Sequence, residues 1–134
     1  MYLPLTMWSP ASCNVCAAFS ITVYYLSWRA LGNVISSDTQ DVEAKAGESV
    51  TLTCSYSTSS SSPLLFWYRQ YPHQIQYILK QGAKGYKTYK HNNPDLKSEK
   101  FQSETSDTTT SLTISSLTAS DSALYMCALS DGAQ

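Results

Sequence analysis

The feature that most constrains this chain is a pair of cysteines, Cys54 and Cys127, each set in a segment where apolar and polar residues alternate. Around the first cysteine, Val50, Leu52 and Cys54 occupy every second position, and threonines occupy the positions between them. Tyr125 shares the parity of Cys127 in the same way. A period of two indicates half-buried strands, so both cysteines are predicted on inward faces, where a disulfide can join two sheets. In an exported protein such a bridge would form and would stabilise the fold by about 4 kcal/mol in the chain-entropy model.

A third segment, residues 64–71, lies between the two cysteines and reads LLFWYRQY. Trp67 shares its parity with Leu65 and is expected in the core. The opposite face carries Phe66, Tyr68 and Gln70. This face is too apolar to be left in water, and Leu124 and Met126 are expected to extend it. We therefore predict an interface here, the alternative being a lone surface tyrosine.

Further short strands are predicted from the spacing of turn-forming and β-forming residues. They cover residues 76–80, 86–89, 100–104 and 111–115. In the last of them Leu112 and Ile114 alternate toward the core, and Leu117 is placed to cover its bottom. Many short strands around one Cys…Trp…Cys frame predict an all-β, two-sheet sandwich.

Composition excludes several classes of function. The 134 residues suffice for one domain, and 9 Lys plus Arg against 10 Asp plus Glu give a net charge of −1. This balance offers no attraction for nucleic acid. His73 and His91 are expected in turns, without a nucleophile or carboxylate pattern around them. No phosphate-binding loop or metal-ligand spacing is present, so the sequence predicts no catalytic residue, cofactor or metal.

The beginning of the chain differs from the rest, because no charged residue precedes Arg29. An apolar run at residues 15–28 is followed by Ala30 and Gly32, small residues that suit a signal peptidase. Residues 1–32 are therefore predicted to be a secretory leader cleaved after Gly32, and residues 33–134 the mature domain. The alternative is a retained signal anchor, although the run is shorter than the roughly 20 residues that a spanning helix needs.

Cys13 and Cys16 form a CxxC pair inside this leader. A redox site or half of a zinc site would need a βαβ pattern or a second ligand pair, and neither follows. We interpret these cysteines as incidental residues of a removed segment.

Taken together, Cys54, Trp67 and the run DSALYMC at residues 121–127 resemble the framework of immunoglobulin variable domains. The resemblance covers about residues 41–130, with the motifs in the family's order. Within that family, the stretches FWYRQYP and CALS are similar to T-cell receptor alpha and delta variable segments more than to antibody chains. The resemblance implies an immunoglobulin V-type sandwich.

The resemblance also implies roles for individual residues. Tyr125 is similar to the tyrosine corner, whose hydroxyl bonds to nearby backbone. Asp121 is similar to an aspartate that pairs with a basic residue, here Lys100. Gln70 is similar to a glutamine that meets its counterpart across the axis of paired variable domains. Its implied neighbours in that contact are Phe66, Tyr68 and Met126.

The implied ligand-contacting loops are residues 57–63, residues 81–85 and the stretch after Cys127. The residues expected to meet a ligand are Ser57, Thr58, Ser59, Ser60, Ser61, Ser62, Gln81, Gly82, Ala83, Lys84, Ala128, Leu129, Ser130 and Asp131. The serine-rich first loop would supply adaptable hydrogen bonds. A flexible linker is the alternative, but a linker would not separate a core cysteine from a core tryptophan.

The resemblance implies antigen recognition at the outer face of the plasma membrane. The domain would form a heterodimer with a second variable domain and bind a peptide held by a histocompatibility molecule, or another protein. Signalling subunits would join through constant and membrane regions. A non-rearranging immunoglobulin-type surface receptor or adhesion protein and an antibody light chain remain alternatives.

One departure from the family pattern concerns the end of the sequence. The sequence ends at Gln134 without the F-G-x-G motif of a last strand. We therefore expect strand G to be missing and the strand that carries Cys127 to have an unpaired edge, which is an aggregation hazard.

Overall fold

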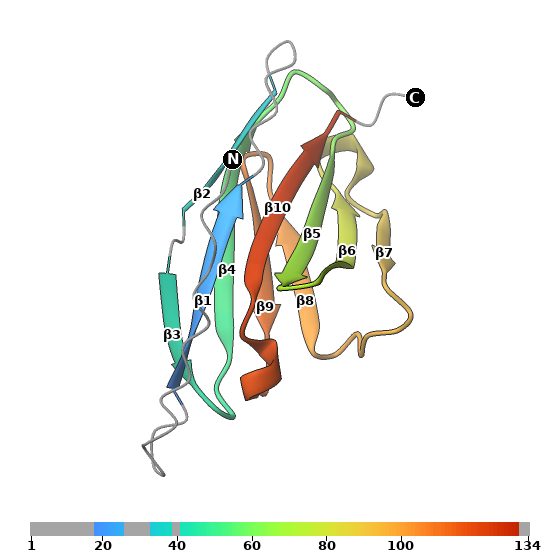
Figure 1. The fold of residues 1–134 in the computed structure, drawn as a ribbon. Helices are drawn as coiled ribbons and strands as arrows, with labels where there is room; N and C mark the ends of the chain where they lie inside the picture. The colour runs from blue at the N-terminus through green and yellow to red at the C-terminus, as the bar shows by residue number, and fades with distance from the viewer. Residues whose placement is uncertain (1–17, 26–32, 39–40, 132–134) are drawn as a thin grey trace.

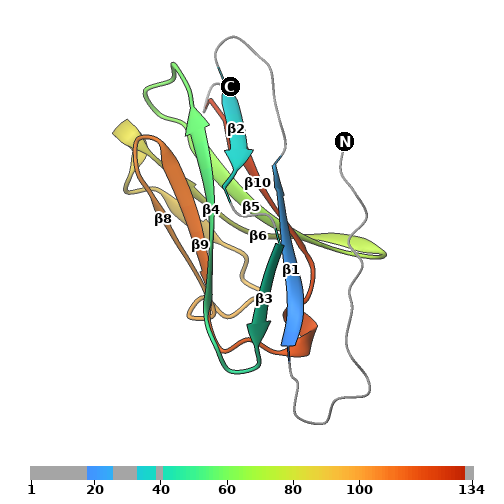
Figure 2. The ribbon, with the colours of Figure 1, turned by 90° about the vertical axis from the view of Figure 1, so that its left-hand side faces the viewer.

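The computed structural model describes residues 18–25, for which it gives the course of the backbone, and residues 33–38 and 41–131. The CxxC pair of Cys13 and Cys16 and the expected cleavage site after Gly32 lie outside these residues. The described chain forms two β-sheets packed face to face (Figures 1 and 2). The predicted all-β, V-type sandwich is confirmed.

The larger sheet has six strands in the order β3-β1-β10-β5-β6-β7. Their bounds are Asp41–Lys45 (β3), Ala18–Tyr25 (β1), Leu124–Ser130 (β10), Leu64–Tyr71 (β5), Gln74–Gly82 (β6) and Lys90–Asn92 (β7). The smaller sheet has four strands in the order β2-β4-β9-β8. These are Val34–Ser37 (β2), Val50–Ser57 (β4), Thr109–Ile114 (β9) and Phe101–Thr105 (β8), with short 3-10 helices at Lys84–Tyr86 (η1) and Ala119–Asp121 (η2).

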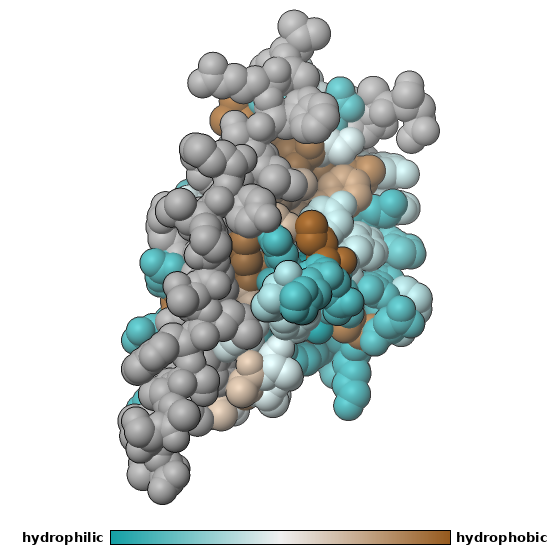
Figure 3. Space-filling view, in the orientation of Figure 1, coloured by the Kyte–Doolittle hydropathy of each residue, from teal (hydrophilic) through white to brown (hydrophobic). Residues whose placement is uncertain are grey.

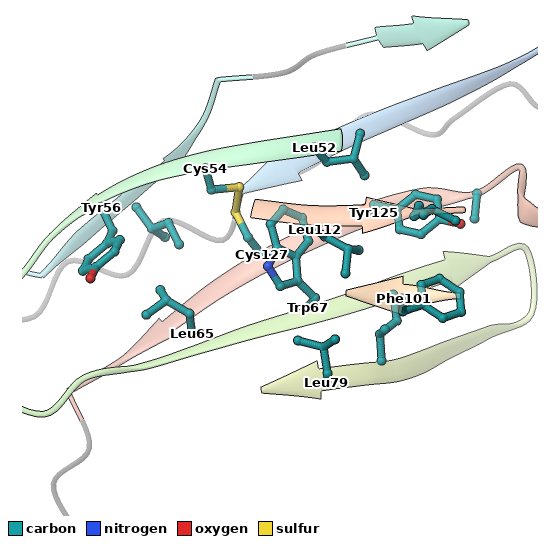
Figure 4. Packing of buried hydrophobic residues seen from close by; sticks show 14 of the residues in the cluster. Leu52, Cys54, Tyr56, Leu65, Trp67, Leu79, Phe101, Leu112, Tyr125 and Cys127 are labelled. Carbon is teal, nitrogen blue, oxygen red and sulfur yellow. A yellow bond between two sulfur atoms is a disulfide. The ribbon is translucent and has the colours of Figure 1, made fainter. Parts of the chain in front are cut away.

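The core lies between the two sheets because the central strands alternate as their sequences predict. In β4, Leu52, Cys54 and Tyr56 are buried, and the residues between them are more exposed. Leu52 pairs in register with Leu112 of β9, so apolar residues of neighbouring strands share one face. Figure 4 shows these side chains meeting those of the opposite sheet.

One predicted strand is wrong. Residues 84–86 form the 3-10 helix η1, and the edge strand β7 begins only at Lys90. The reason is a tight approach at Gly82, where an added Cβ would lie 2.1 Å from the Tyr86 carbonyl oxygen. The chain therefore turns sharply after β6, and Lys84 adopts a positive φ of 53° within that turn. The other three expected strands are present with bounds shifted by a few residues.

The edge of β10 also differs from expectation. It was expected to be unpaired, but β1 runs parallel to it, with Thr22 opposite Leu124 and Tyr25 opposite Cys127. On its other side β1 pairs antiparallel with β3. Figure 1 shows β1 between β3 and β10. Within the described residues, β10 is thus an interior strand.

We predict that Leu52→Ala lowers the free energy of unfolding by about 2–5 kcal/mol, because it leaves a cavity at a fully buried position. Thr51→Ala, one residue earlier on the exposed face of the same strand, serves as the control and should change stability by less than about 1 kcal/mol. Urea unfolding followed by tryptophan fluorescence measures both. Equal losses for the two variants would contradict the assigned faces of β4.

Candidate functional site

A disulfide between Cys54 and Cys127 joins β4 of one sheet to β10 of the other, as predicted, with the Cα atoms 6.7 Å apart. The indole of Trp67 lies beside the bridge (Figure 4). Its Nε1 donates a hydrogen bond to the hydroxyl of Thr110, at 3.2 Å. All five expected core residues are fully buried: Leu52, Trp67, Leu112, Ile114 and Tyr125. This frame fixes the positions of both sheets.

A buried charge cluster closes one end of the sandwich. Asp121 is 2% exposed, and the structure brings it together with Lys100, whose Nζ lies 2.9 Å from Oδ2. The Asp121 carboxylate also accepts a hydrogen bond from the backbone N–H of Thr118 at 2.8 Å. A buried carboxylate needs such partners because desolvation alone would strongly disfavour its charge.

Arg69 is a second cation of this cluster, and sequence reasoning assigned it no role. Its Nη1 lies 3.4 Å from Asp121 Oδ1, and its Nε donates to the side-chain oxygen of Gln76 at 2.7 Å. The guanidinium also lies over the rings of Tyr71 and Phe101, at 5.1 and 5.2 Å from their centroids. The sequence does contain a signal for this role. Arg69 lies two residues after Trp67, on the same inward face of the strand, so its charge requires a buried partner.

Tyr125 binds the same segment from the core side. Its hydroxyl donates to the Asp121 carbonyl oxygen at 2.7 Å, which is the contact that a tyrosine corner makes. Burial raises the pKa of this phenol well above its usual value, and the nearby Arg69 offsets only part of the effect. Tyr125 therefore stays protonated and keeps its donor at alkaline pH.

The outer face of β5, β6 and β7 carries a row of rings, which we call the aromatic face: Phe66, Tyr68, Tyr77 and His91. Successive ring centroids are 6.2, 5.8 and 5.8 Å apart. Burial, chiefly, raises the pKa of Tyr77 to about 12, with smaller contributions from neighbouring tyrosines. His91 was expected in a turn but lies in β7, where its Nδ1 is 2.9 Å from the Tyr77 hydroxyl.

The three rings Phe66, Tyr68 and Tyr77 are half-buried, His91 is exposed, and the row is mixed in polarity. Lys80 extends it, with its Nζ 5.8 Å from the Phe66 centroid and 5.7 Å from that of Tyr89. In Figure 3, which views this side of the molecule, hydrophobic residues are interspersed with hydrophilic ones. Aromatic rings with polar edges, rather than a purely apolar patch, are typical of the surfaces of paired proteins.

Two residues expected on this exposed face are instead buried. Leu124 and Met126 are 3% and 5% exposed. Tyr68 and Gln70, which lie opposite Met126 and Leu124 in register, are half-buried. Of the four expected interface residues, Phe66, Tyr68 and Gln70 therefore remain at the surface, and Met126 does not.

The expected ligand loops gather at one end of the sandwich, at the top in Figure 1. Lys84 Nζ donates to the Thr58 carbonyl oxygen at 3.0 Å, which ties the second loop to the first. The N–H of Gly85 donates to the Ser61 carbonyl oxygen at 2.9 Å. The hydroxyl of Ser60 donates to the carbonyl oxygen of Asp131, beyond β10. The three segments thus form one continuous surface.

Not every expected loop residue reaches that surface. Ser57, Ser59, Ser61 and Asp131 are exposed, and Thr58, Ser60, Ser62, Gln81, Lys84, Ala128, Leu129 and Ser130 are half-buried. Gly82 and Ala83 are buried, so the expectation that they meet a ligand is wrong. The N–H of Ala83 donates inward to the Pro63 carbonyl oxygen at 3.1 Å, which turns this segment toward the core.

Comparison with known proteins agrees with this geometry. Residues 37–134 match the model of the immunoglobulin V-set domain. The rabbit (Oryctolagus cuniculus) T-cell receptor alpha chain V region RL-5 is 35% identical over 92% of this chain and 85% of its own length. Human (Homo sapiens) T cell receptor alpha variable 38-2/delta variable 8 is 30% identical over 74% of this chain and 82% of its own.

A solved structure described as the structural basis of T cell specificity and activation by the bacterial superantigen toxic shock syndrome toxin-1 contains a chain of the same fold. That chain superposes with a TM-score of 0.57 over 87% of this chain and 83% of its own, at 20% identity.

The chain therefore belongs to the immunoglobulin V-set family. Within this family it is a variable domain of the T-cell receptor alpha/delta type. The relatives named above favour this class over an antibody light chain. The family is non-enzymatic, in agreement with the sequence. In the described part of the chain, no cluster of three potential metal ligands occurs, and no helix is long and apolar enough to cross a membrane.

We predict that Asp121→Asn lowers the free energy of unfolding by about 3 kcal/mol or more, because it leaves two cations facing each other without a buried anion. Lys100→Met should cost about 1 kcal/mol, since Arg69 still neutralises the carboxylate and the Lys100 side chain is partly exposed. Urea unfolding compares the two variants. A larger loss for Lys100→Met would contradict the central role of Asp121.

Alkaline pH gives a second prediction. The pKa of Tyr125 is raised in the folded state, so its contribution to stability is complete below the unfolded value of about 10 and is lost as pH rises toward the folded value. The free energy of unfolding should fall above pH 10, with one group contributing up to about 1.4 kcal/mol per pH unit. Tyr125→Phe should flatten this fall, whereas an unchanged slope would contradict it.

Proposed function

We propose that this domain recognises a protein ligand together with a second variable domain, as one chain of a heterodimeric T-cell receptor. The aromatic face supports the pairing, and the joined loops at one end of the sandwich support the recognition. The relatives named above supply the class of receptor. The preferred ligand is a peptide held by a histocompatibility molecule.

The pairing proposal rests on Phe66, Tyr68 and Gln70 of β5. Phe66 and Tyr68 stack with an interplanar angle of 10°, so they already hold one arrangement in the isolated chain. A preorganised pair of rings loses little side-chain entropy on association, which favours an interface. The hydroxyls of Tyr68 and Tyr77 add polar groups that can bond across the contact.

The recognition proposal rests on the way in which the loops support one another. The bonds from Lys84 to Thr58 and from Gly85 to Ser61 fix the second loop against the first. Serine hydroxyls on this supported loop can then adapt to a ligand without the whole loop being ordered at the time of binding.

We further propose that residues 1–32 direct export and that cleavage after Gly32 releases the domain to the extracellular side. Constant and membrane regions of a complete receptor would then connect it to signalling subunits. The abrupt appearance of charge from Arg29 onward supports this boundary.

The pairing is tested with a T-cell receptor beta variable domain as the probe. We expect the double variant Phe66→Ala/Tyr68→Ala to weaken the dissociation constant by about 30-fold, because central aromatic residues commonly carry about 2 kcal/mol or more of binding free energy. Sedimentation equilibrium of the mixed domains measures this change.

The matched control is Thr51→Ala/Thr113→Ala. These threonines form a hydroxyl pair at 3.0 Å in the four-stranded sheet, away from the aromatic face. The control should leave the dissociation constant unchanged, and far-ultraviolet circular dichroism verifies the fold of both variants. Equal effects of the two double variants would refute pairing through β5.

A further inference from the structure

The charges of this chain are unevenly placed. Between Glu48 and Asp95 the sequence contains no Asp or Glu, but it contains a run of lysines: Lys80, Lys84, Lys87 and Lys90. Lys80 belongs to the aromatic face. The other three, which we call the basic edge, extend from η1 to the edge strand β7. The right-hand margin of Figure 3, where Figure 1 places β7, is mostly hydrophilic. Because the whole chain has a net charge of −1, the rest of the chain is negative.

Ion pairs within the chain do not neutralise the basic edge. In the described residues, both salt bridges are made by Asp121, and neither involves a lysine of this edge. Lys87 and Lys90 are exposed, and Lys84 is half-buried. Exposed charges of one sign, without a counterpart in the chain, attract a partner of the opposite charge and accelerate the encounter with it.

Two tyrosine rings lie among these lysines. Tyr86 and Tyr89 stack with their centroids 5.0 Å apart and an interplanar angle of 7°, and Tyr86 is 42% exposed. On the side of the aromatic face, Lys80 Nζ lies 5.7 Å from the Tyr89 centroid. Tyrosine provides a large contact area at a low cost in side-chain entropy, and it is therefore common where one protein recognises another.

The backbone that carries the rings is held in place. The N–H of Tyr89 donates to the Tyr86 carbonyl oxygen at 3.0 Å, and the N–H of Gly82 donates to the Tyr89 carbonyl oxygen at 2.9 Å. A Cβ added at Gly85 would lie 2.9 Å from the Ser61 carbonyl oxygen, so the turn approaches the first loop this closely only because residue 85 has no side chain. The tyrosine pair thus holds one arrangement before a ligand binds, which reduces the entropy lost on binding.

The basic edge is continuous with the loops to which recognition is assigned. Lys84 Nζ donates to the Thr58 carbonyl oxygen, so the basic edge joins the first loop directly. Gly82 and Ala83 are buried, which leaves residues 84–90 as the part of this segment that a ligand can touch. A protein that meets the serine hydroxyls of the first loop therefore also meets the lysines and the tyrosine pair.

We propose that the basic edge is a docking surface for an acidic patch of the protein ligand, one that exposes Asp and Glu carboxylates. Lys87 and Lys90 attract these carboxylates, and the ring of Tyr86 supplies contact area between them. This inference rests on the proposed recognition of a protein ligand and names the chemistry of the ligand surface that meets residues 84–90. It does not involve Phe66 or Tyr68, so pairing through β5 holds or fails independently.

A matched pair of labelled peptides tests the acidic ligand. One peptide alternates glutamate with alanine, and the other has glutamine in place of each glutamate. Fluorescence anisotropy measures the dissociation constant of the unpaired 134-residue chain for each peptide. At about 0.1 M salt we expect the glutamate peptide to bind about tenfold more tightly. At about 1 M salt, where the Debye length is about 3 Å, this difference should disappear. Equal binding of the two peptides at the lower salt concentration would overturn the proposal.

Two variants of equal net charge test the position of the cations. Lys90→Glu, in β7, should weaken binding of the glutamate peptide by about tenfold at about 0.1 M salt. The matched control is Lys45→Glu, an exposed lysine of β3. The two strands are opposite edges of the six-stranded sheet, about 24 Å apart at about 4.8 Å per strand, and charges at this distance are screened. The control should change the dissociation constant by less than about twofold. Far-ultraviolet circular dichroism verifies both folds, and equal effects of the two variants would overturn the proposal.

Two further probes examine other anionic ligands. A heparin fragment carries sulfate groups, and vesicles of phosphatidylserine and phosphatidylcholine present an anionic membrane. Binding of either probe without binding of the glutamate peptide would assign the basic edge to a glycan or a membrane and would overturn the proposal. Because every measurement uses the unpaired chain, a failure of pairing with the beta variable domain leaves these results interpretable.

Discussion

The contact between the Cys54–Cys127 bridge and the indole of Trp67 is the interaction on which the rest of the structure depends. The bridge connects a central strand of each sheet, and Trp67 adds its hydrogen bond to Thr110 across the same space. Two sheets joined at their centres and filled by large side chains have a defined separation and relative orientation. The loops at one end and the outer face of β5 to β7 therefore lie at fixed positions.

The two ends of the sandwich have different physical roles. At the lower end in Figure 1, η2 carries Asp121, and its carboxylate, held by Arg69 and Lys100, fixes the start of β10. Few of these groups reach solvent, so this end serves stability. At the upper end, polar loops bond to one another through backbone groups and leave serine hydroxyls exposed.

The six-stranded sheet is divided between two uses. On its β5-β6-β7 side the sheet presents stacked rings, whose polar edges suit association with another domain. On its β3-β1-β10 side, the strands pair with one another within the chain. The two sides meet at β10, which pairs with β1 on one edge and with β5 on the other. Within the described residues β10 therefore has no unpaired backbone edge, because an interior strand is paired on both sides.

The sequence by itself determined the sandwich, the bridge, the burial of Trp67 and the inward parity of β4 and β9, because a period of two translates directly into the faces of a strand. It also indicated the meeting of Lys100 with Asp121 through a family resemblance, but it did not assign Arg69, whose partners come from strands distant in the chain. Only the tertiary structure decided that Gly82 and Ala83 turn inward, that Met126 is buried and that residues 18–25 complete the sheet. The physical reason is that the alternation of residues along a strand shows which face each side chain occupies but does not show which strand lies beside it. The apolar character of residues 18–25 likewise does not show whether they pair with another strand.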